Sequence, residues 1–139
     1  MAWRLINSNG ITIKSQPMKS KYFFVGMHNK PSMTPLDSRT RTGKVINEII
    51  KGLPNESIKT NLCEVEYLPK DISEIEKFSE LWHEKYKPQK GDVIILLGRW
   101  VNDNFKHKDQ KTISLTHPAG IFGTKSKYEY IKNAVGSII

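Results

Sequence analysis

The sequence predicts a single α/β domain, a three-layer α/β/α sandwich whose middle layer is a parallel sheet of four strands. Short apolar runs alternate with stretches whose apolar residues recur at helical spacing, and this strand–helix pair occurs four times. Such alternation builds right-handed β-α-β units with parallel strands. A length of 139 residues without repeats or low-complexity linkers suits one domain covering residues 1–139.

The first clear strand is Tyr22–Val25, an apolar run that stops at Gly26. Before it, residues 1–20 predict only a turn and an edge strand or a packed arm. In open parallel sheets, ligands bind beyond the carboxyl ends of the strands. We therefore expect Met27, His28 and Asn29 on the rim of a binding pocket, with an ordinary strand-to-loop turn as the alternative.

A loop rich in Ser, Thr, Pro and Arg leads into a helix over residues 43–51, whose apolar residues share one face. The string Arg41-Thr42-Gly43-Lys44 hints at a phosphate-binding P-loop. That motif is rejected, because Ser38 occupies its first glycine position and Val45 its Ser/Thr position.

The second strand, Ser57–Cys63, carries the polar pair Thr60-Asn61 near its end. Asp71 is expected to cap the following helix, and Glu74 completes a capping box. His83 is interpreted as a surface residue of this helix. The expected buried face of the helix consists of Ile72, Ile75, Phe78, Trp82 and Tyr86.

Asp92–Leu97 is the clearest strand of the chain, and it is apolar on both faces, which predicts a central position in the sheet. Arg99–Phe105 follows as a short helix, in which Trp100 is expected to pack. The fourth strand is Thr112–Leu115. The last helix is expected to begin at Ser126, where Ser126 and Glu129 form a second capping box. Its expected inward face consists of Tyr128, Ile131, Val135 and Ile138.

The charge distribution favours a polyanionic partner, with nucleic acid first. The chain has 22 Lys and Arg against 14 Asp and Glu, a net charge of +8. A merely lysine-rich surface is the alternative. Acids concentrate between Glu56 and Glu84. Basic residues gather around the first strand and its loop, and around the segment that contains His117: Lys14, Lys19, Lys21, Lys30, Arg39, Arg41 and Lys44, then Lys106, Lys108, Lys111, Lys125 and Lys127.

No apolar run approaches the ~20 residues that span a bilayer, and the N-terminus lacks the pattern of a signal peptide. We therefore expect a cytoplasmic protein. A monomer is expected as well. The single cysteine, Cys63, excludes an internal disulfide and any multi-cysteine metal or iron–sulfur site. We expect no cofactor and no metal.

Five segments in order resemble a known family. They are Val25-Gly26-Met27, Thr42–Ile49, Thr60-Asn61, Val93–Arg99 and His117-Pro118-Ala119. Together, over residues 22–139, they resemble the uracil-DNA glycosylase superfamily, and in layout they are most similar to its iron–sulfur and mismatch-specific types. The resemblance implies a strand order of 2-1-3-4 and a pocket for a base flipped out of DNA. It also implies hydrolysis of the bond between the sugar C1′ and the base nitrogen.

The resemblance also implies roles for individual residues. His117 matches the histidine that donates to uracil O2, and Asn61 matches the asparagine that reads the base edge. Gly26 and Met27 belong to the base-binding strand end. The alternatives are a histidine that caps the loop before Pro118 and, for Asn61, a turn residue at a strand end. The expected DNA contacts are Lys30, Arg39, Arg41, Lys44, Lys125 and the apolar pair Ile121 and Phe122, of which Phe122 could instead pack under the last helix.

The first motif departs from the family. Where the family often has the Asp or Asn that positions water, this chain has His28, followed by Asn29, and either side chain could hold the water. The loop around Ser38 offers no aromatic residue to stack on a base, and the iron–sulfur cysteines are missing. These departures leave room for a changed base specificity or a loss of catalysis.

The sequence therefore predicts a DNA glycosylase that excises uracil or a related altered base. A protein of the same fold that holds a base or a DNA end without cutting is the first alternative. An unrelated nucleotide-binding α/β domain is the second, and the rejected P-loop argues against it.

Overall fold

The computed structural model describes residues 6–8, 10–13, 20–118 and 123–139. Within these residues, no helix has the length and apolar character needed to cross a membrane. The elements in chain order are β1 (Ile6–Ser8), β2 (Gly10–Ile13), β3 (Tyr22–His28), α1 (Arg41–Lys51), β4 (Ser57–Cys63), α2 (Ile72–Tyr86), β5 (Val93–Leu97), α3 (Arg99–Asn104), β6 (Lys111–Leu115) and α4 (Thr124–Ile138). β1 and β2 pair with each other as an antiparallel two-stranded sheet.

The main sheet has four parallel strands in the order β4-β3-β5-β6, which confirms the predicted order and the central position of β5. Tyr22 lies opposite both Ser57 and Val93, and Val93 lies opposite Lys111. The amino ends of all four strands therefore meet at one edge of the sheet. The carboxyl ends meet at the other edge.

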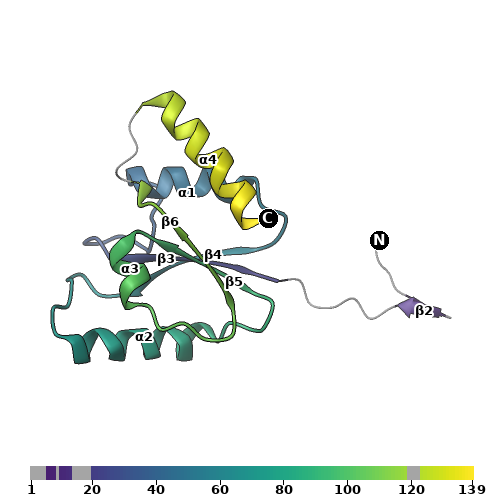
Figure 1. Cartoon of the computed structure of the whole chain (residues 1–139), viewed down its shortest axis with the longest axis horizontal. Coiled ribbons are helices and arrows are strands. Elements are labelled where there is room, and N and C mark those ends of the chain that lie inside the picture. The colour runs from purple at the N-terminus through teal and green to yellow at the C-terminus, as the bar shows by residue number, and fades with distance from the viewer. Residues whose placement is uncertain (1–5, 9, 14–19, 119–122) are drawn as a thin grey trace.

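Helices cover both faces of the sheet, so the predicted three-layer sandwich is confirmed (Figure 1). On one face, α1 and α4 enclose a core that includes Phe24 and Ile95. On the other face, α2 and α3 enclose a core that includes Phe23 and Ile94, with Trp100 packed against it as predicted. Consecutive residues of each strand thus serve opposite layers, as strand geometry requires.

Thr60 and Asn61 are separated by this alternation. The Thr60 hydroxyl is fully buried beneath α2, where it accepts from Trp82 Nε1 at 2.8 Å and donates to the Phe24 carbonyl at 2.8 Å. Thr60 is therefore part of the core. The side chain of Asn61 is left at the carboxyl edge of the sheet, where it is 3% exposed.

β3 is longer than predicted and continues through Gly26 to His28, which lies opposite Cys63. The prediction that the strand stops at Gly26 was wrong. Gly26 lies opposite Asn61, and a Cβ atom built on it would be 2.4 Å from Asn61 Oδ1. A glycine inside a strand is expected where a neighbouring group approaches this closely.

Two helices begin earlier than predicted. α1 starts at Arg41, because the Thr40 side chain caps it by accepting from the Gly43 N–H at 2.9 Å. α4 starts at Thr124 after Gly123, so the capping box of Ser126 and Glu129 was wrong.

The predicted inward face of α4 needs one correction. Tyr128 is 67% exposed, whereas Ile138 is buried and Ile131 and Val135 pack against the core. Tyr130 takes the inward position instead, and its hydroxyl donates to the Thr116 carbonyl.

Asp71 caps α2 as predicted, but the roles expected for Glu74, Ile72 and His83 differ in the structure. Asp71 caps the helix by accepting from the Ser73 N–H at 2.8 Å, while Glu74 accepts from the hydroxyl of Tyr67. Ile72 is 75% exposed, because it lies in the first turn, beyond the edge of the core.

His83 is buried, contrary to the prediction of a surface residue. Its Nε2 lies 2.7 Å from the Lys106 carbonyl, which can only accept, so Nε2 donates. The N–H of Lys106 donates to Ser79 Oγ at 2.7 Å. These bonds fasten the segment between α3 and β6 to α2, which gives His83 a structural role.

The first turn of α1 packs tightly against the loop before it. A Cβ atom built on Gly43 would lie 1.8 Å from the backbone oxygen of Asp37 and 2.7 Å from that of Leu36. Backbone atoms cannot yield as a flexible side chain can, so this contact requires glycine. Gly136, near the end of α4, has no atom within 4 Å of its built Cβ position.

We therefore expect opposite effects from the same substitution in two helices. Gly43→Ala should lower the free energy of unfolding by about 2–3 kcal/mol, because the loop and α1 must separate. Gly136→Ala should raise it by about 0.5–1 kcal/mol, because alanine favours the helix and space is open. Urea denaturation followed by circular dichroism measures both. Equal effects of the two substitutions would contradict the packing described here.

Candidate functional site

A cavity of about 230 Å³ lies at the carboxyl edge of the sheet. The ends of strands, with His117 beyond β6, supply one part of its wall. The loop between β3 and α1 and the first turn of α1 supply the rest. The lining residues are Gly26, Met27 and His28 of β3, Asn61 of β4, His117 beyond β6, and Lys30, Met33, Thr34, Leu36, Asp37, Thr40 and Thr42.

The structure brings together five of the six residues that were expected to bind the base or act in catalysis. Gly26, Met27, His28, Asn61 and His117 all line this one cavity. Asn29 is not among the described residues that line it. Its Oδ1 instead accepts at 2.7 Å from Nδ2 of Asn61, which does line the cavity.

His117 is held against the end of β5. Gly98 has φ +91°, and a Cβ atom built on it would lie 3.2 Å from the Cβ of His117. The N–H of Gly98 donates to the Leu115 carbonyl at 2.9 Å, which extends the β5–β6 pairing to the start of this segment. Pro118 on its other side is buried. The histidine is therefore supported from both sides.

The environment of His117 favours its neutral form. Burial lowers the pKa of its imidazole, and the positive charge of Lys30 lowers that pKa further. At neutral pH the ring is therefore uncharged and carries one N–H. A neutral, positioned imidazole can donate a hydrogen bond to an oxygen that gains negative charge.

His28 presents a different capability. Its Nδ1 lies 3.0 Å from the Asn29 carbonyl, which can only accept, so Nδ1 carries the hydrogen in this bond. In the neutral ring, Nε2 is then an acceptor. Such a group can hold a water molecule in place.

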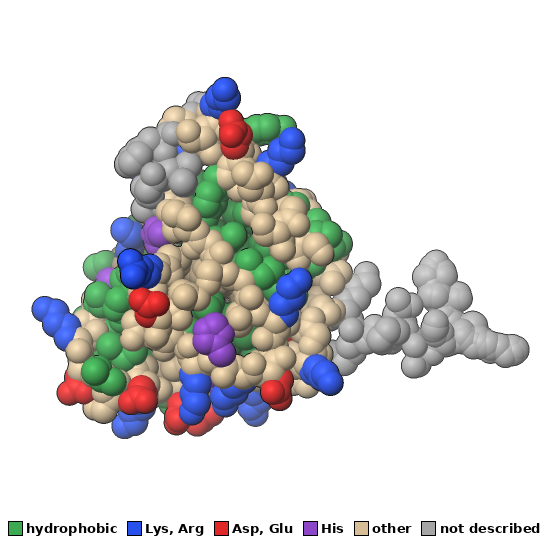
Figure 2. All heavy atoms as spheres, in the orientation of Figure 1, with side chains coloured by type: hydrophobic (Ala, Val, Ile, Leu, Met, Phe, Trp, Pro, Cys, Tyr) green, Lys and Arg blue, Asp and Glu red, His purple; other side chains and the backbone are tan. Residues whose placement is uncertain are grey.

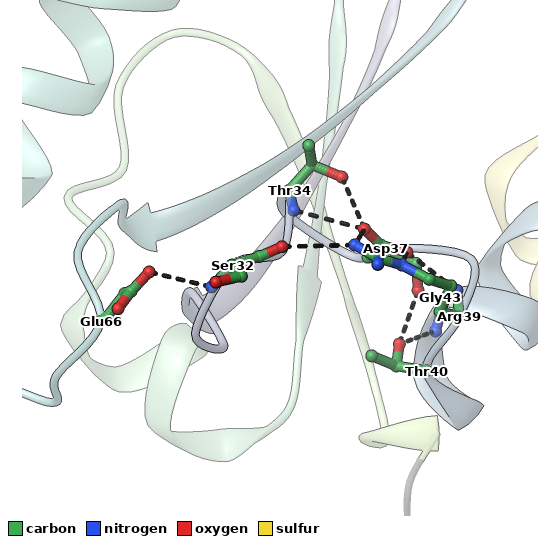
Figure 3. A network of polar contacts seen from close by, with 7 residues as sticks. All are labelled: Ser32, Thr34, Asp37, Arg39, Thr40, Gly43 and Glu66. Carbon is green, nitrogen blue, oxygen red and sulfur yellow. Dashed lines mark hydrogen bonds and ion pairs between the residues drawn. The ribbon is translucent and has the colours of Figure 1, made fainter.

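The loop wall of the cavity is organised by Asp37, which is 8% exposed (Figure 3). Its carboxylate accepts from the Arg39 side chain at 2.9 and 3.0 Å, from the Arg39 backbone at 2.9 Å and from the Thr34 hydroxyl at 3.2 Å. Its hydrogen bonds with Arg39 hold the pKa of the carboxyl well below its usual range. Asp37 is thus an ionised structural centre.

Further bonds fix the ends of this loop. The Thr40 hydroxyl donates to the Asp37 carbonyl at 2.7 Å, and the Ser32 N–H donates to Glu66 Oε2 at 3.1 Å (Figure 3). Leu36 adopts φ +51°, and its Cδ2 lies 3.0 Å from the Cβ position built on Gly26. Its side chain therefore covers Gly26 within the cavity.

Sequence reasoning missed this wall. Residues 30–42 were described only as a polar loop, although the presence of Asp37 and Thr40 just before a helix favours an ordered, capped turn. Both residue types bond locally to backbone groups and precede helices. Arg39 was expected to contact DNA. Its guanidinium pairs with Asp37 and so helps to hold the loop.

The remaining expected DNA contacts lie near the same edge. Lys30 lines the cavity and is exposed, and Arg41 and Lys44 are exposed in the first turn of α1. Lys125 is exposed in the first turn of α4. Ile121 and Phe122 lie outside the described residues, so their expected roles stay predictions.

The predicted basic group at Lys106, Lys108 and Lys111 does not flank His117. Lys111 opens β6 opposite Val93, so this group lies toward the amino edge of the sheet, away from the cavity. Figure 2 shows acidic side chains mixed with lysines along the lower edge of the molecule, where α2 lies. Half of the acidic residues between Glu56 and Glu84 lie on that helix, namely Glu74, Glu76, Glu80 and Glu84.

Among the described residues, no three His, Cys, Asp or Glu side chains gather as a metal site would require. No family model matches the sequence, and a search of curated proteins found no match. The arrangement at the cavity therefore has to be interpreted from its own chemistry.

Removing the charge of Lys30 should raise the pKa of His117 toward its ordinary value, because a neighbouring cation disfavours the charged ring. We expect this for Lys30→Gln, measured by titrating the imidazole resonances in nuclear magnetic resonance spectra. Lys44→Gln, which removes a lysine that does not line the cavity, is the matched control. An unchanged His117 titration in Lys30→Gln would contradict the described contact.

Proposed function

We propose that this protein is a DNA glycosylase of the uracil-DNA glycosylase type, which excises uracil or a related altered base. One observation carries the proposal. The side chains of His28, Asn61 and His117, from the ends of three different strands, converge on a single cavity. This is the location at which open parallel sheets bind ligands.

The reaction requires stabilisation of a departing base. Water attacks C1′ of the sugar, the bond from C1′ to the base nitrogen breaks, and the base leaves with the bonding electron pair. Negative charge then develops on the base oxygens. The neutral imidazole of His117 suits a donor to that charge, and the ammonium group of Lys30 contributes a favourable field.

The attacking water needs a group that holds it near the sugar. His28 lines the cavity and has an acceptor nitrogen available in its neutral ring. The carboxamide oxygen of Asn29 already accepts from Asn61. These contacts favour His28 over Asn29 for this role.

DNA is the proposed partner, bound by a cytoplasmic monomer. Exposed Lys30, Arg41, Lys44 and Lys125 lie near the cavity. α1, α3 and α4 each begin after the carboxyl end of a strand, and helix N-termini carry partial positive charge. A base extruded from the stack could enter the cavity while its flanking phosphates meet these groups.

A second candidate is a protein of the same fold that holds a base without cutting it. Asp37 is the only carboxylate among the described residues that line the cavity, and it is occupied by Arg39 and Thr34. No carboxylate in this lining is then available to activate water. This observation favours binding without hydrolysis as the alternative.

Removal of the His117 imidazole separates these candidates. If His117 stabilises the departing base, His117→Ala should slow single-turnover excision from a uracil-containing oligonucleotide by roughly 10²–10³-fold, with little change in DNA affinity. Asn61→Ala should slow excision and also relax discrimination between uracil and cytosine. Circular dichroism confirms folding. Excision by His117→Ala at the wild-type rate would show that the assigned role is wrong.

The proposed DNA surface predicts a salt dependence that differs between the two edges of the sheet. Each phosphate contact contributes about 0.9 to the slope of log affinity against log salt for duplex DNA. Lys44→Gln should lower that slope by about this amount, whereas Lys108→Gln, toward the opposite edge, should leave it unchanged. Fluorescence anisotropy at several salt concentrations measures both. Equal slopes for the two variants would contradict a DNA-binding surface at the carboxyl edge of the sheet.

A further inference from the structure

The carboxamide of Asn61 is held by one neighbour. Asn61 Nδ2 donates to Asn29 Oδ1 at 2.7 Å, and Asn61 itself is 3% exposed. Asn29 is anchored in turn, because its N–H donates to the Val65 carbonyl at 3.0 Å and its carbonyl accepts from His28 Nδ1 at 3.0 Å. Asn29 therefore presents its side chain from a fixed backbone.

This bond determines which atoms Asn61 offers to the cavity. Asn61 Oδ1 lies 2.4 Å from the Cβ position built on Gly26, and Leu36 Cδ2 lies 3.0 Å from the same point. Gly26 and Leu36 both line the cavity. The carbonyl oxygen of Asn61 therefore lies beside the lining residues Gly26 and Leu36, while its amide nitrogen is directed to Asn29.

An unrestrained asparagine cannot distinguish uracil from cytosine. Rotation of its amide by 180° exchanges the acceptor and the donor. One orientation then matches the N3–H and O4 of uracil, and the other matches the N3 and N4–H₂ of cytosine. Here that rotation alone would bring Asn61 Oδ1 against Asn29 Oδ1, and two acceptors repel each other at such a distance, so the Asn61 amide can turn over only together with that of Asn29.

We propose that Asn29 is a positioning residue that locks the Asn61 amide with its oxygen toward the cavity, and thereby selects bases with an N3–H donor over cytosine. The selected bases are uracil, thymine and those of their derivatives that keep the N3–H between two carbonyl groups. This inference rests on the proposed function, since it assumes that the cavity receives a base.

The experiment compares Asn29→Ala with Asn29→Asp, because aspartate keeps an acceptor oxygen and alanine does not. The probes are two single-stranded oligonucleotides that differ only in one 2′-fluoro-2′-deoxyuridine or 2′-fluoro-2′-deoxycytidine, in which the fluorine blocks cleavage of the base, and the readout is the ratio of their dissociation constants. We expect wild type to prefer the uracil strand. Asn29→Ala should reduce that preference roughly fivefold or more, the effect of one hydrogen bond. Asn29→Asp should keep the ratio within about threefold of wild type.

A ratio unchanged in Asn29→Ala would overturn the proposal. So would a loss of preference in Asn29→Asp as large as that in Asn29→Ala, since Asn29 would then act as the donor. Wild type that binds both strands equally would also overturn it. This binding measurement does not require excision. Failure of the glycosylase proposal, seen as no base release, is therefore distinguished from failure of the positioning role proposed for Asn29.

The side-chain NH₂ resonances of Asn61 provide a measurement without any ligand. We expect them to shift and exchange faster with solvent in Asn29→Ala, and to remain close to wild type in Asn29→Asp. A merely structural role of Asn29 would change stability in both variants without changing base preference. Circular dichroism melting curves record that stability.

Discussion

The buried carboxylate of Asp37 determines the shape of the cavity wall. A buried charge is tolerated when it is paired and hydrogen-bonded, and Asp37 achieves this through Arg39 and Thr34 within its own loop. The same loop turns back onto α1, where Gly43 leaves room for the Asp37 backbone. Because the pKa of this carboxyl is lowered, its stabilising contribution is complete at neutral pH and is lost as the pH falls below 3.8. Met33, Leu36 and Thr40 line the cavity because this loop is held in place.

The sheet supplies the rigid side of the cavity. β3, β4 and β6 end at the same edge, so their terminal residues meet although they are far apart in the sequence. Two close approaches refine their positions, with Asn61 over Gly26 and His117 against Gly98. Other buried polar groups have a structural role. Thr60 bonds β4 to Trp82 of α2, and His83 bonds α2 to the segment that contains Lys106. The site chemistry is thus confined to one edge of the molecule.

Much of the fold could be predicted from the sequence, because apolar periodicity reports which face of an element is buried. The four strands and their order followed from the alternation of patterns and from the resemblance. Errors arose where a residue type has more than one physical use. Gly26 signals a close approach within a strand, where the pattern suggested a strand end. His83 is polar but bonded to a carbonyl, so it tolerates burial.

Part of the site could also be predicted, namely the strand-end residues Met27, His28, Asn61 and His117. The loop wall could not, because the pairing of Asp37 with Arg39 and the backbone conformation of Leu36 are tertiary features with weak local signals. The placement of Lys106 to Lys111 failed for a related reason. Proximity in sequence to His117 does not reveal that a strand separates the two edges of the sheet.

The most direct test of a base-excising cavity is a survey with the wild-type protein. Duplex and single-stranded oligonucleotides, each with one altered base, are incubated with the protein and then treated with alkali, which cleaves at abasic sites. We expect strand breaks at uracil or a related base that keeps its N3–H. Binding to these oligonucleotides without a break at any base would contradict excision and leave a base-binding protein of the same fold.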